Sequence, residues 1–341
     1  MTTIRVFGLS LLVTAAALVA GYWHGGVTAL FLLVVLAILE ISLSFDNAII
    51  NATILKQMSQ FWQQMFLTIV WVTAGLDPVR AMRLALNPPP GGALDFPDGS
   101  PSYEKLISAA HPQIAAFGGM FLLTLFLDFV FNDREIKWLK WIEAPFARIG
   151  RLGQVHVMVA CVTLIFAGPG LTDSSDDLGT VMVAGLLGLV TYLVVNGLSR
   201  ALQPPRVGAG PGELAAQGAV GKAGFMLFMY LEVLDASFSF DGVTGAFAIT
   251  SDPIVIALGL GLVGAMFVRS ITIYLVRQDA LDRYVYLEHG AHWAIGALAV
   301  IMLMSIDHHL QIPEWITASI GVVFIGAAFT NSVVRNRRAG G

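Results

Sequence analysis

Long apolar segments alternate with short polar connections along the whole chain, and this pattern predicts a membrane protein with many spans. A membrane-spanning helix needs about 20 mostly apolar residues. Ten segments approach or exceed that length: Ile4–Tyr22, Val27–Leu55, Phe61–Leu76, Pro112–Phe131, Val155–Gly168, Leu178–Leu198, Phe225–Ile249, Pro253–Val276, His289–Ser305 and Trp315–Val334. Phe61–Leu76 and Val155–Gly168 are marginal in length. We therefore expect an all-α helical bundle with about nine or ten spans.

The composition agrees with a membrane location. The 341 residues are 56% hydrophobic and only 12% charged, whereas soluble domains carry about 25% charged residues. The net charge of −4 gives no reason to expect a nucleic-acid partner. The one cysteine, Cys161, excludes a disulfide within the chain.

Basic residues are distributed unevenly over the polar connections. Arg335, Arg337 and Arg338 follow the last apolar segment, and the connection Asp133–Gly153 is also basic. If ten spans cross the membrane in alternating directions, the acidic connection Asp173–Asp177 lies on the side opposite to these basic residues. Because cytoplasmic connections carry the excess of Lys and Arg, we expect both termini to be cytoplasmic.

A short acidic motif occurs twice inside these apolar segments. The first acidic motif runs from Glu40 to Asn47 and the second acidic motif from Asp235 to Gly242, and their spans are expected to have opposite orientations. Five plus five spans would make two inverted repeats, residues 1–170 and 171–341, as in many secondary transporters. Within the first repeat, the polar stretch 77–110 is expected to be an exposed loop.

The motif residues are oxygen donors placed in what should be hydrocarbon. Burying one ionisable group there costs at least about 2.5–3.5 kcal/mol, so a function is expected. The candidate metal ligands are four carboxylates and three neutral donors: Glu40, Asp46, Asp235, Asp241, Asn47, Ser44 and Ser239. Such donors suit Mn²⁺, Ca²⁺ or Mg²⁺. Protons are the competing ligand, and exchange of a cation for protons would use both. No prosthetic group is expected.

Helical geometry limits how the motif can bind one ion. Residues at i, i+4, i+7 and i+11 share a helix face, which groups Glu40, Ser44, Asn47 and Asn51, and a similar stripe groups Glu232, Asp235, Ser239 and Gly242. The two acids within one motif are six residues apart and so lie about 120° apart around a straight helix. Either the helix is broken near Ser-Phe-Asp, or one site takes carboxylates from both motifs. Gly242 favours a break in the second motif.

Other polar residues inside or beside the spans have simpler interpretations. Arg269 is expected to form a structural ion pair with the acidic cluster, with a coupling role as the alternative. Glu288, His289 and His292 are expected to form a solvated helix start, with a proton relay as the alternative. The small-residue pair Gly185 and Gly188 is expected to allow close helix packing.

The chain resembles the TerC family of integral membrane proteins, and more narrowly its DUF475 branch. The resemblance rests on both acidic motifs and on the segments His111–Gly119 and Leu287–Trp293. The resemblance implies a role in tellurium resistance and, as for several members, manganese export. The family's motif residues correspond by the same resemblance to Glu40, Asp46, Asn47, Asp235 and Asp241. Similar members carry a further apolar stretch at the position between Ile69 and Val70, so the first repeat is expected to be short there.

These observations predict a transporter of the bacterial inner membrane that exports a divalent metal, with manganese as the favoured ion. The alternative is a non-transporting membrane scaffold in a stress-response complex, in which the acids only pair helices. No activated nucleophile and no phosphate-binding glycine loop occurs in the sequence, so an enzyme is not expected.

Overall fold

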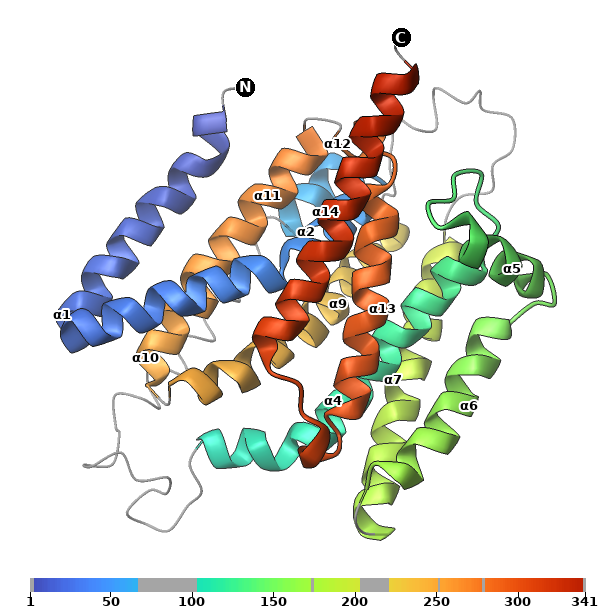
Figure 1. The fold of residues 1–341 in the computed structure, drawn as a ribbon, viewed down its shortest axis with the longest axis horizontal. Helices are drawn as coiled ribbons and strands as arrows, with labels where there is room; N and C mark the ends of the chain where they lie inside the picture. The colour runs from blue at the N-terminus through green and yellow to red at the C-terminus, as the bar shows by residue number, and fades with distance from the viewer. Residues whose placement is uncertain are drawn as a thin grey trace.

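The structure is a computed structural model that describes residues 3–66, 103–172, 175–202, 221–250, 252–277 and 280–339. All regular elements in these ranges are helices, which confirms the all-α prediction (Figure 1). The α-helices are α1 (Thr3–Leu43), α2 (Phe45–Leu55), α4 (Tyr103–Phe131), α5 (Lys140–Gly150), α6 (Val155–Gly170), α7 (Ser175–Leu202), α9 (Gly221–Ile249), α10 (Pro253–Ile256), α11 (Ala265–Arg277), α12 (Ala280–Arg283), α13 (Leu287–Met304) and α14 (Glu314–Ala339). A π-helix, η1 (Ala257–Gly264), and a 3-10 helix, η2 (His308–Leu310), complete the list.

Several of these helices are long and apolar enough to cross a membrane, so the chain is a multi-pass membrane protein. Among the described residues five helical segments qualify: Val6–Ile38, Ala109–Phe131, Asp177–Gly197, Ile254–Val276 and Leu287–Met304. A sixth arises if α5 and α6, which meet at 101°, count as one span. This is fewer than the nine or ten expected, and α9 and α14 are not among them although they have 29 and 26 residues. The inverted repeat stays a prediction.

Helix α1 is a hairpin of two helical arms. Gly25 and Gly26 have non-helical dihedral angles, and Gly26 has φ 65° and ψ −148°, a conformation that essentially only glycine adopts. The break agrees with the expected boundary between Tyr22 and Val27. In Figure 1 the second arm diverges from the first at this turn, runs toward the centre of the bundle and leads into α2.

The polar stretch predicted as a loop up to Ala110 ends earlier in the structure. Helix α4 begins at Tyr103, so residues 103–110 are helical and that boundary was wrong. The span predicted to begin at Pro112 therefore starts earlier, and Pro112 lies inside α4. Residues 77–102, Ile69 and Val70 lie outside the described residues.

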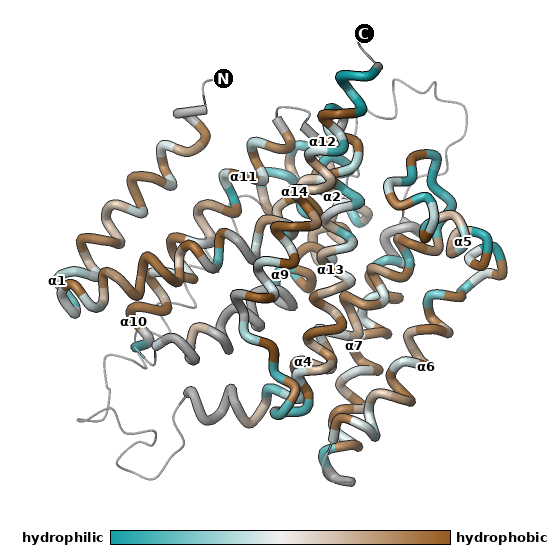
Figure 2. Tube along the Cα trace, viewed as in Figure 1, coloured by the Kyte–Doolittle hydropathy of each residue, from teal (hydrophilic) through white to brown (hydrophobic). Residues whose placement is uncertain are grey.

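Helix α4 packs against α7, α9 and α13 and lies at the centre of the bundle. Its core includes Phe121, Tyr192 and Leu231, which are almost fully buried. A smaller core joins the second arm of α1 to η1 through Leu36 and Val263. Large apolar side chains remain exposed on the outer helices, as expected for surfaces that face lipid. Figure 2 shows that hydrophobic residues run along most of α1 and α6.

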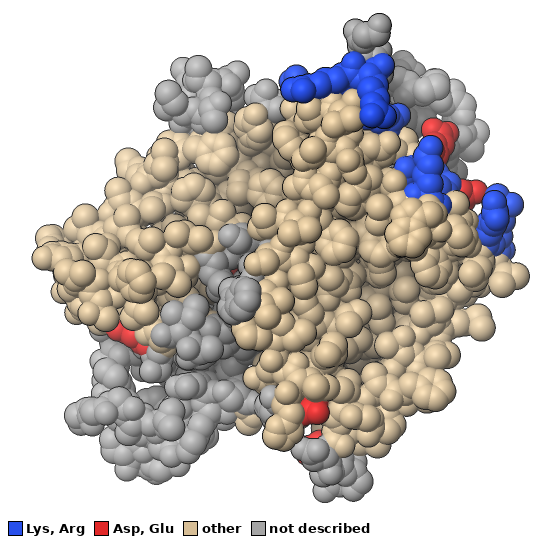
Figure 3. Space-filling view, in the orientation of Figure 1, with Lys and Arg blue, Asp and Glu red and all other residues tan. Residues whose placement is uncertain are grey.

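The two ends of the bundle differ in charge. Both termini lie at one end, together with the connection from α4 to α5, whereas the turn from α6 to α7 lies at the other (Figure 1). Basic side chains gather where α14 finishes and beside α5 (Figure 3). Spans that alternate in direction would place both termini and the α4–α5 connection at the same end of the bundle, as here. The side of the membrane on which this basic end lies stays a prediction.

We expect Gly188→Ala to destabilise the bundle. A Cβ atom at Gly188 of α7 would lie 2.1 Å from the backbone oxygen of Phe117 in α4, and such overpacking costs about 1–3 kcal/mol. Thermal unfolding in detergent should show a lower midpoint. Gly197→Ala on the same helix is the control, because nothing lies within 4 Å of the added methyl group. Equal midpoints for the two variants would contradict the close α4–α7 contact.

Candidate functional site

The first acidic motif lies at the junction between α1 and α2. Helix α1 ends at Leu43, and Ser44 is a turn residue with φ −90° and ψ 7° before α2 begins at Phe45. Backbone hydrogen bonds still cross the junction, from Ser44 N to Glu40 O at 2.8 Å and from Ala48 N to Ser44 O at 3.0 Å. The helix break expected near Ser-Phe-Asp is therefore only a local distortion of the helix in the first acidic motif.

The second acidic motif lies within α9, which runs as one helix from Gly221 to Ile249. The predicted break at Gly242 was wrong. One glycine inside a helix costs only about 1 kcal/mol relative to alanine, and the backbone hydrogen bonds of a helix of 29 residues can offset that cost.

Side chains from the two motif regions contact each other across the α2–α9 interface. Asn51 Nδ2 donates a hydrogen bond to Asp235 Oδ1 at 2.8 Å, and Asn47 makes a further hydrogen bond to Asp235. Within the first motif, Ser44 Oγ donates to Glu40 Oε1 at 2.6 Å. The carboxylates of Glu40 and Asp235 are close enough to repel each other electrostatically. The structure thus brings one acid of each motif together.

Two buried oxygen atoms beside this contact have no hydrogen-bond partner in the described part of the chain. They are Asn51 Oδ1 and Glu232 Oε1. Glu232 also lies near enough to Asp235 for their charges to repel. Buried polar atoms are nearly always satisfied, so an unsatisfied one calls for an explanation such as a water molecule or an ion. A cation at this point would both satisfy the oxygens and reduce the repulsion.

The π-helix η1 lies directly against the acidic residue of α1. A Cβ atom at Gly264 would lie 2.0 Å from Glu40 Cγ, and one at Gly259 would lie 2.9 Å from Leu36 Cβ. These two glycines therefore allow η1 to approach the second arm of α1 closely. π-Helical turns occur often at functional sites. Arg269 follows on α11, a helix that packs on α1 and α2.

The remaining predicted ligands are placed only by their backbone. Asp46 lies in α2, and Ser239 and Asp241 lie in α9, but their side chains are outside the described residues. No group of three or more His, Cys, Asp or Glu among the described side chains could hold a metal ion. The acids that the structure places together are two, Glu40 and Asp235, with Glu232 beside the second.

Two residues at this contact were not in the predicted ligand set. Asn51 and Glu232 belong to the helical stripes that the sequence shows, but they lie outside the matched motifs. The periodicity of the stripes, four residues after Asn47 and three before Asp235, is the signal that identifies them.

A second buried polar cluster joins α5 to the start of α13. Glu143 is 4% exposed and accepts hydrogen bonds from Trp138 N at 3.0 Å and from Trp293 Nε1 at 3.1 Å. His289 Nδ1 lies 3.2 Å from Glu143 Oε1. The carboxylate thus fixes the start of α5 against α13.

The histidines of α13 are buried, so the prediction of a solvated helix start was wrong for them. His289 is 4% and His292 6% exposed. The ring of His292 stacks on Phe129, with the centroids 3.7 Å apart. Only Glu288 keeps the expected partial exposure, and it pairs with Arg134 at 2.7 Å. The covering elements come from α4 and α5, which lie far from α13 in the sequence.

Comparison with known proteins gives one family. The family described as "Protein of unknown function (DUF475)" matches residues 45–339. The match includes the second acidic motif but only Phe45, Asp46 and Asn47 of the first, since it begins after Glu40. No curated protein and no solved structure shows significant similarity to the chain.

We expect Glu143→Gln to lower stability in a manner that depends on pH. Although burial alone would raise the pKa of Glu143, hydrogen bonds from His289 and Trp293 hold that pKa below its usual value. The ionised form therefore stabilises the fold above the pKa of an unfolded carboxyl, and this contribution is lost as the pH falls through the folded pKa. Loss of a hydrogen bond to a charged group costs about 1.5–3 kcal/mol.

Thermal unfolding in detergent at pH 7 and at acid pH measures this effect. The difference between wild type and Glu143→Gln should be largest at neutral pH and should shrink in acid. Glu135→Gln, on an exposed residue of the same connection, is the control and should behave as wild type. A difference that stays constant with pH would contradict the role of the ionised carboxylate.

Proposed function

The chain belongs to the DUF475 family, and we propose that it is a membrane transporter that exports a divalent metal cation, with Mn²⁺ as the favoured ion. The family description assigns no function. Support comes from the buried contact between the two acidic motifs and from the resemblance of those motifs to the TerC family. The same resemblance associates the protein with tellurium resistance.

The observation that carries the proposal is the buried contact between α2 and α9, where Asn47 and Asn51 hydrogen-bond to Asp235. Glu40 lies near enough to this contact for its charge to repel that of Asp235. Glu40 and Asp235 lie on α1 and α9, far apart in the sequence, and a structural role alone would favour balancing each charge with a basic group. The hydrogen bonds that the described residues give them come from neutral donors, Ser44 to Glu40 and Asn51 to Asp235. The unsatisfied oxygens of Asn51 and Glu232 lie beside them. A divalent cation offsets the repulsion that this arrangement creates.

The donor types favour a hard cation that is bound and then released. Carboxylate, amide and hydroxyl oxygens bind Mn²⁺, Ca²⁺ and Mg²⁺ better than Cu⁺ or Zn²⁺. Neutral donors such as Asn51 and Ser44 add ligands without the charge that would hold the ion too tightly. When the cation leaves, protons can neutralise the neighbouring carboxylates, which is the chemistry that cation/proton exchange requires.

We propose the bacterial inner membrane as the location, with both termini in the cytoplasm. The basic residues at the end of α14 and in the α4–α5 connection support this orientation through the positive-inside rule. Export then moves the cation from the basic end of the bundle to the opposite end.

We expect substitutions of the motif acids to abolish manganese export. Glu40→Gln and Asp235→Asn keep the shape of the side chains but remove the charges that offset a divalent cation, and Asp46→Asn and Asp241→Asn test the remaining acids. Cells that express the wild type should hold less manganese in Mn²⁺-rich medium than cells with an empty vector. The four variants should return the manganese content to the empty-vector level, as measured by elemental analysis.

Glu135→Gln serves as the control, because Glu135 is an exposed acid in the α4–α5 connection. Its cells should keep the wild-type manganese content. If the motif variants also keep that content at normal protein levels, the transport proposal fails. The alternative of a membrane scaffold whose acids only join helices would then be favoured.

We expect Gly264→Ala to reduce export far more than Gly259→Ala. Both variants place a methyl group between η1 and α1, but only the methyl at position 264 meets Glu40, whereas that at position 259 meets Leu36 and Leu33. The same manganese assay, together with thermal unfolding, separates the two effects. Equal loss of export and of stability in both variants would show that helix packing, and not the position of Glu40, is what matters.

A further inference from the structure

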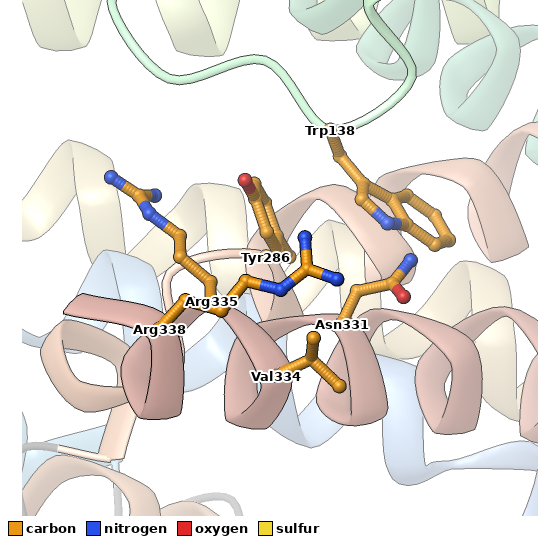
Figure 4. Close-up of a pocket in the computed structure, with 6 residues that line it drawn as sticks. All are labelled: Trp138, Tyr286, Asn331, Val334, Arg335 and Arg338. Carbon is orange, nitrogen blue, oxygen red and sulfur yellow. The ribbon is translucent and has the colours of Figure 1, made fainter. Parts of the chain in front are cut away.

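A pocket of about 480 Å³ lies at the basic end of the bundle, apart from the acidic site. It is lined by Trp138, Tyr286, Asn331, Val334, Arg335 and Arg338. Figure 4 shows that α14 supplies four of these side chains, while Trp138 comes from the connection before α5 and Tyr286 from the residue before α13. Its volume is in the range of sites for small organic ligands.

The pocket is suited to an anion. Each polar side chain in its lining can donate hydrogen bonds, two of them are arginines, and the lining contains no carboxylate. The indole Nε1 of Trp138 is buried and has no hydrogen-bond partner among the described residues. Guanidinium groups match the geometry of phosphate oxygens especially well.

Contacts within the protein hold the walls of this pocket in place. Tyr286 N donates to Ser332 Oγ at 3.0 Å, which ties the start of α13 to α14. Asn336 Nδ2 donates to the backbone oxygen of Arg283 at 2.7 Å. The guanidinium carbon of Arg335 lies 5.4 Å from the centre of the Tyr286 ring. Tyr286 and Arg335 are thus held against each other at the wall of the pocket.

The position of the pocket favours a ligand that comes from the bilayer. Helix α5 begins two residues after Trp138 and exposes Trp141 at 77% and Ile149 at 45%, so it is suited to lie along a membrane surface. Val334, in the pocket itself, is 40% exposed. Tryptophan, tyrosine and arginine are the residues that gather at the level of lipid headgroups.

We propose that this pocket binds the phosphate headgroup of an acidic phospholipid. The arginines would hold the phosphate, the indole of Trp138 would donate to it, and the acyl chains would run along the apolar surface of α14. This inference is independent of the proposed transport activity, because it uses none of the residues of the acidic site.

The test measures binding of fluorescent phosphatidylglycerol to the full-length protein in detergent, with phosphatidylcholine as the zwitterionic comparison. Arg335→Gln together with Arg338→Gln should weaken phosphatidylglycerol binding by about 25-fold, about five-fold for each charge near the lipid surface. Trp138→Phe, which removes the indole donor but keeps an aromatic ring, should weaken it by a smaller factor. Arg337→Gln is the matched control, because Arg337 lies in the same last turn but outside the lining.

The proposal holds if the double variant loses phosphatidylglycerol binding while Arg337→Gln retains it. It is overturned if Arg337→Gln loses as much, since the effect would then be general attraction to basic residues. Unchanged binding in the double variant also overturns it. Competition by millimolar inorganic phosphate would show that a soluble anion, and not a lipid, is the ligand, and would overturn the assignment to the bilayer.

Discussion

The constraint on which this structure depends is that polar groups inside an apolar bundle need partners from other helices. Lipid offers none, so a polar contact between two helices fixes their relative position. Asn51 fixes α2 to α9 through Asp235, and Glu143 fixes α5 to α13 through His289 and Trp293. The two contacts differ in one respect. The donors to Glu143 include a histidine and an indole N–H, whereas the donors to Glu40 and Asp235 in the described part of the chain are the neutral side chains of Ser44 and Asn51, with unsatisfied oxygens beside them.

This difference separates a structural polar cluster from a candidate binding site. A carboxylate that is satisfied by protein donors stabilises one conformation and gains nothing from an added ion. A group with surplus negative charge is most stable when something positive is present. The close approach of η1 to α1 at Gly264 brings backbone next to Glu40, and this excludes bulky side chains from the space beside that acid.

Much of this arrangement could be predicted from the sequence, and the rest depends on contacts between distant segments. Helical spacing correctly grouped Glu40 with Ser44, and the glycines at 25 and 26 lie where the sequence places a boundary between spans. The break expected at Gly242 does not occur, because local propensity is weak beside the hydrogen bonds of a long helix. The burial of His289 could not be predicted, because its partner Glu143 lies 146 residues away and shares no pattern with it.

The winding of η1 determines how closely η1 approaches the second arm of α1. Gly259 and Gly264 are five residues apart, and both face the second arm of α1. In an α-helix, residues five apart point about 140° away from each other, whereas the i→i+5 repeat of a π-helix places them on one side. The distance between η1 and the second arm of α1 therefore depends on the winding of η1. If η1 rewound into an α-helix, one of the two glycines would turn away from α1, and a larger residue of η1 would face α1 in its place. The backbone of η1 beside Glu40 would then lie farther from α1.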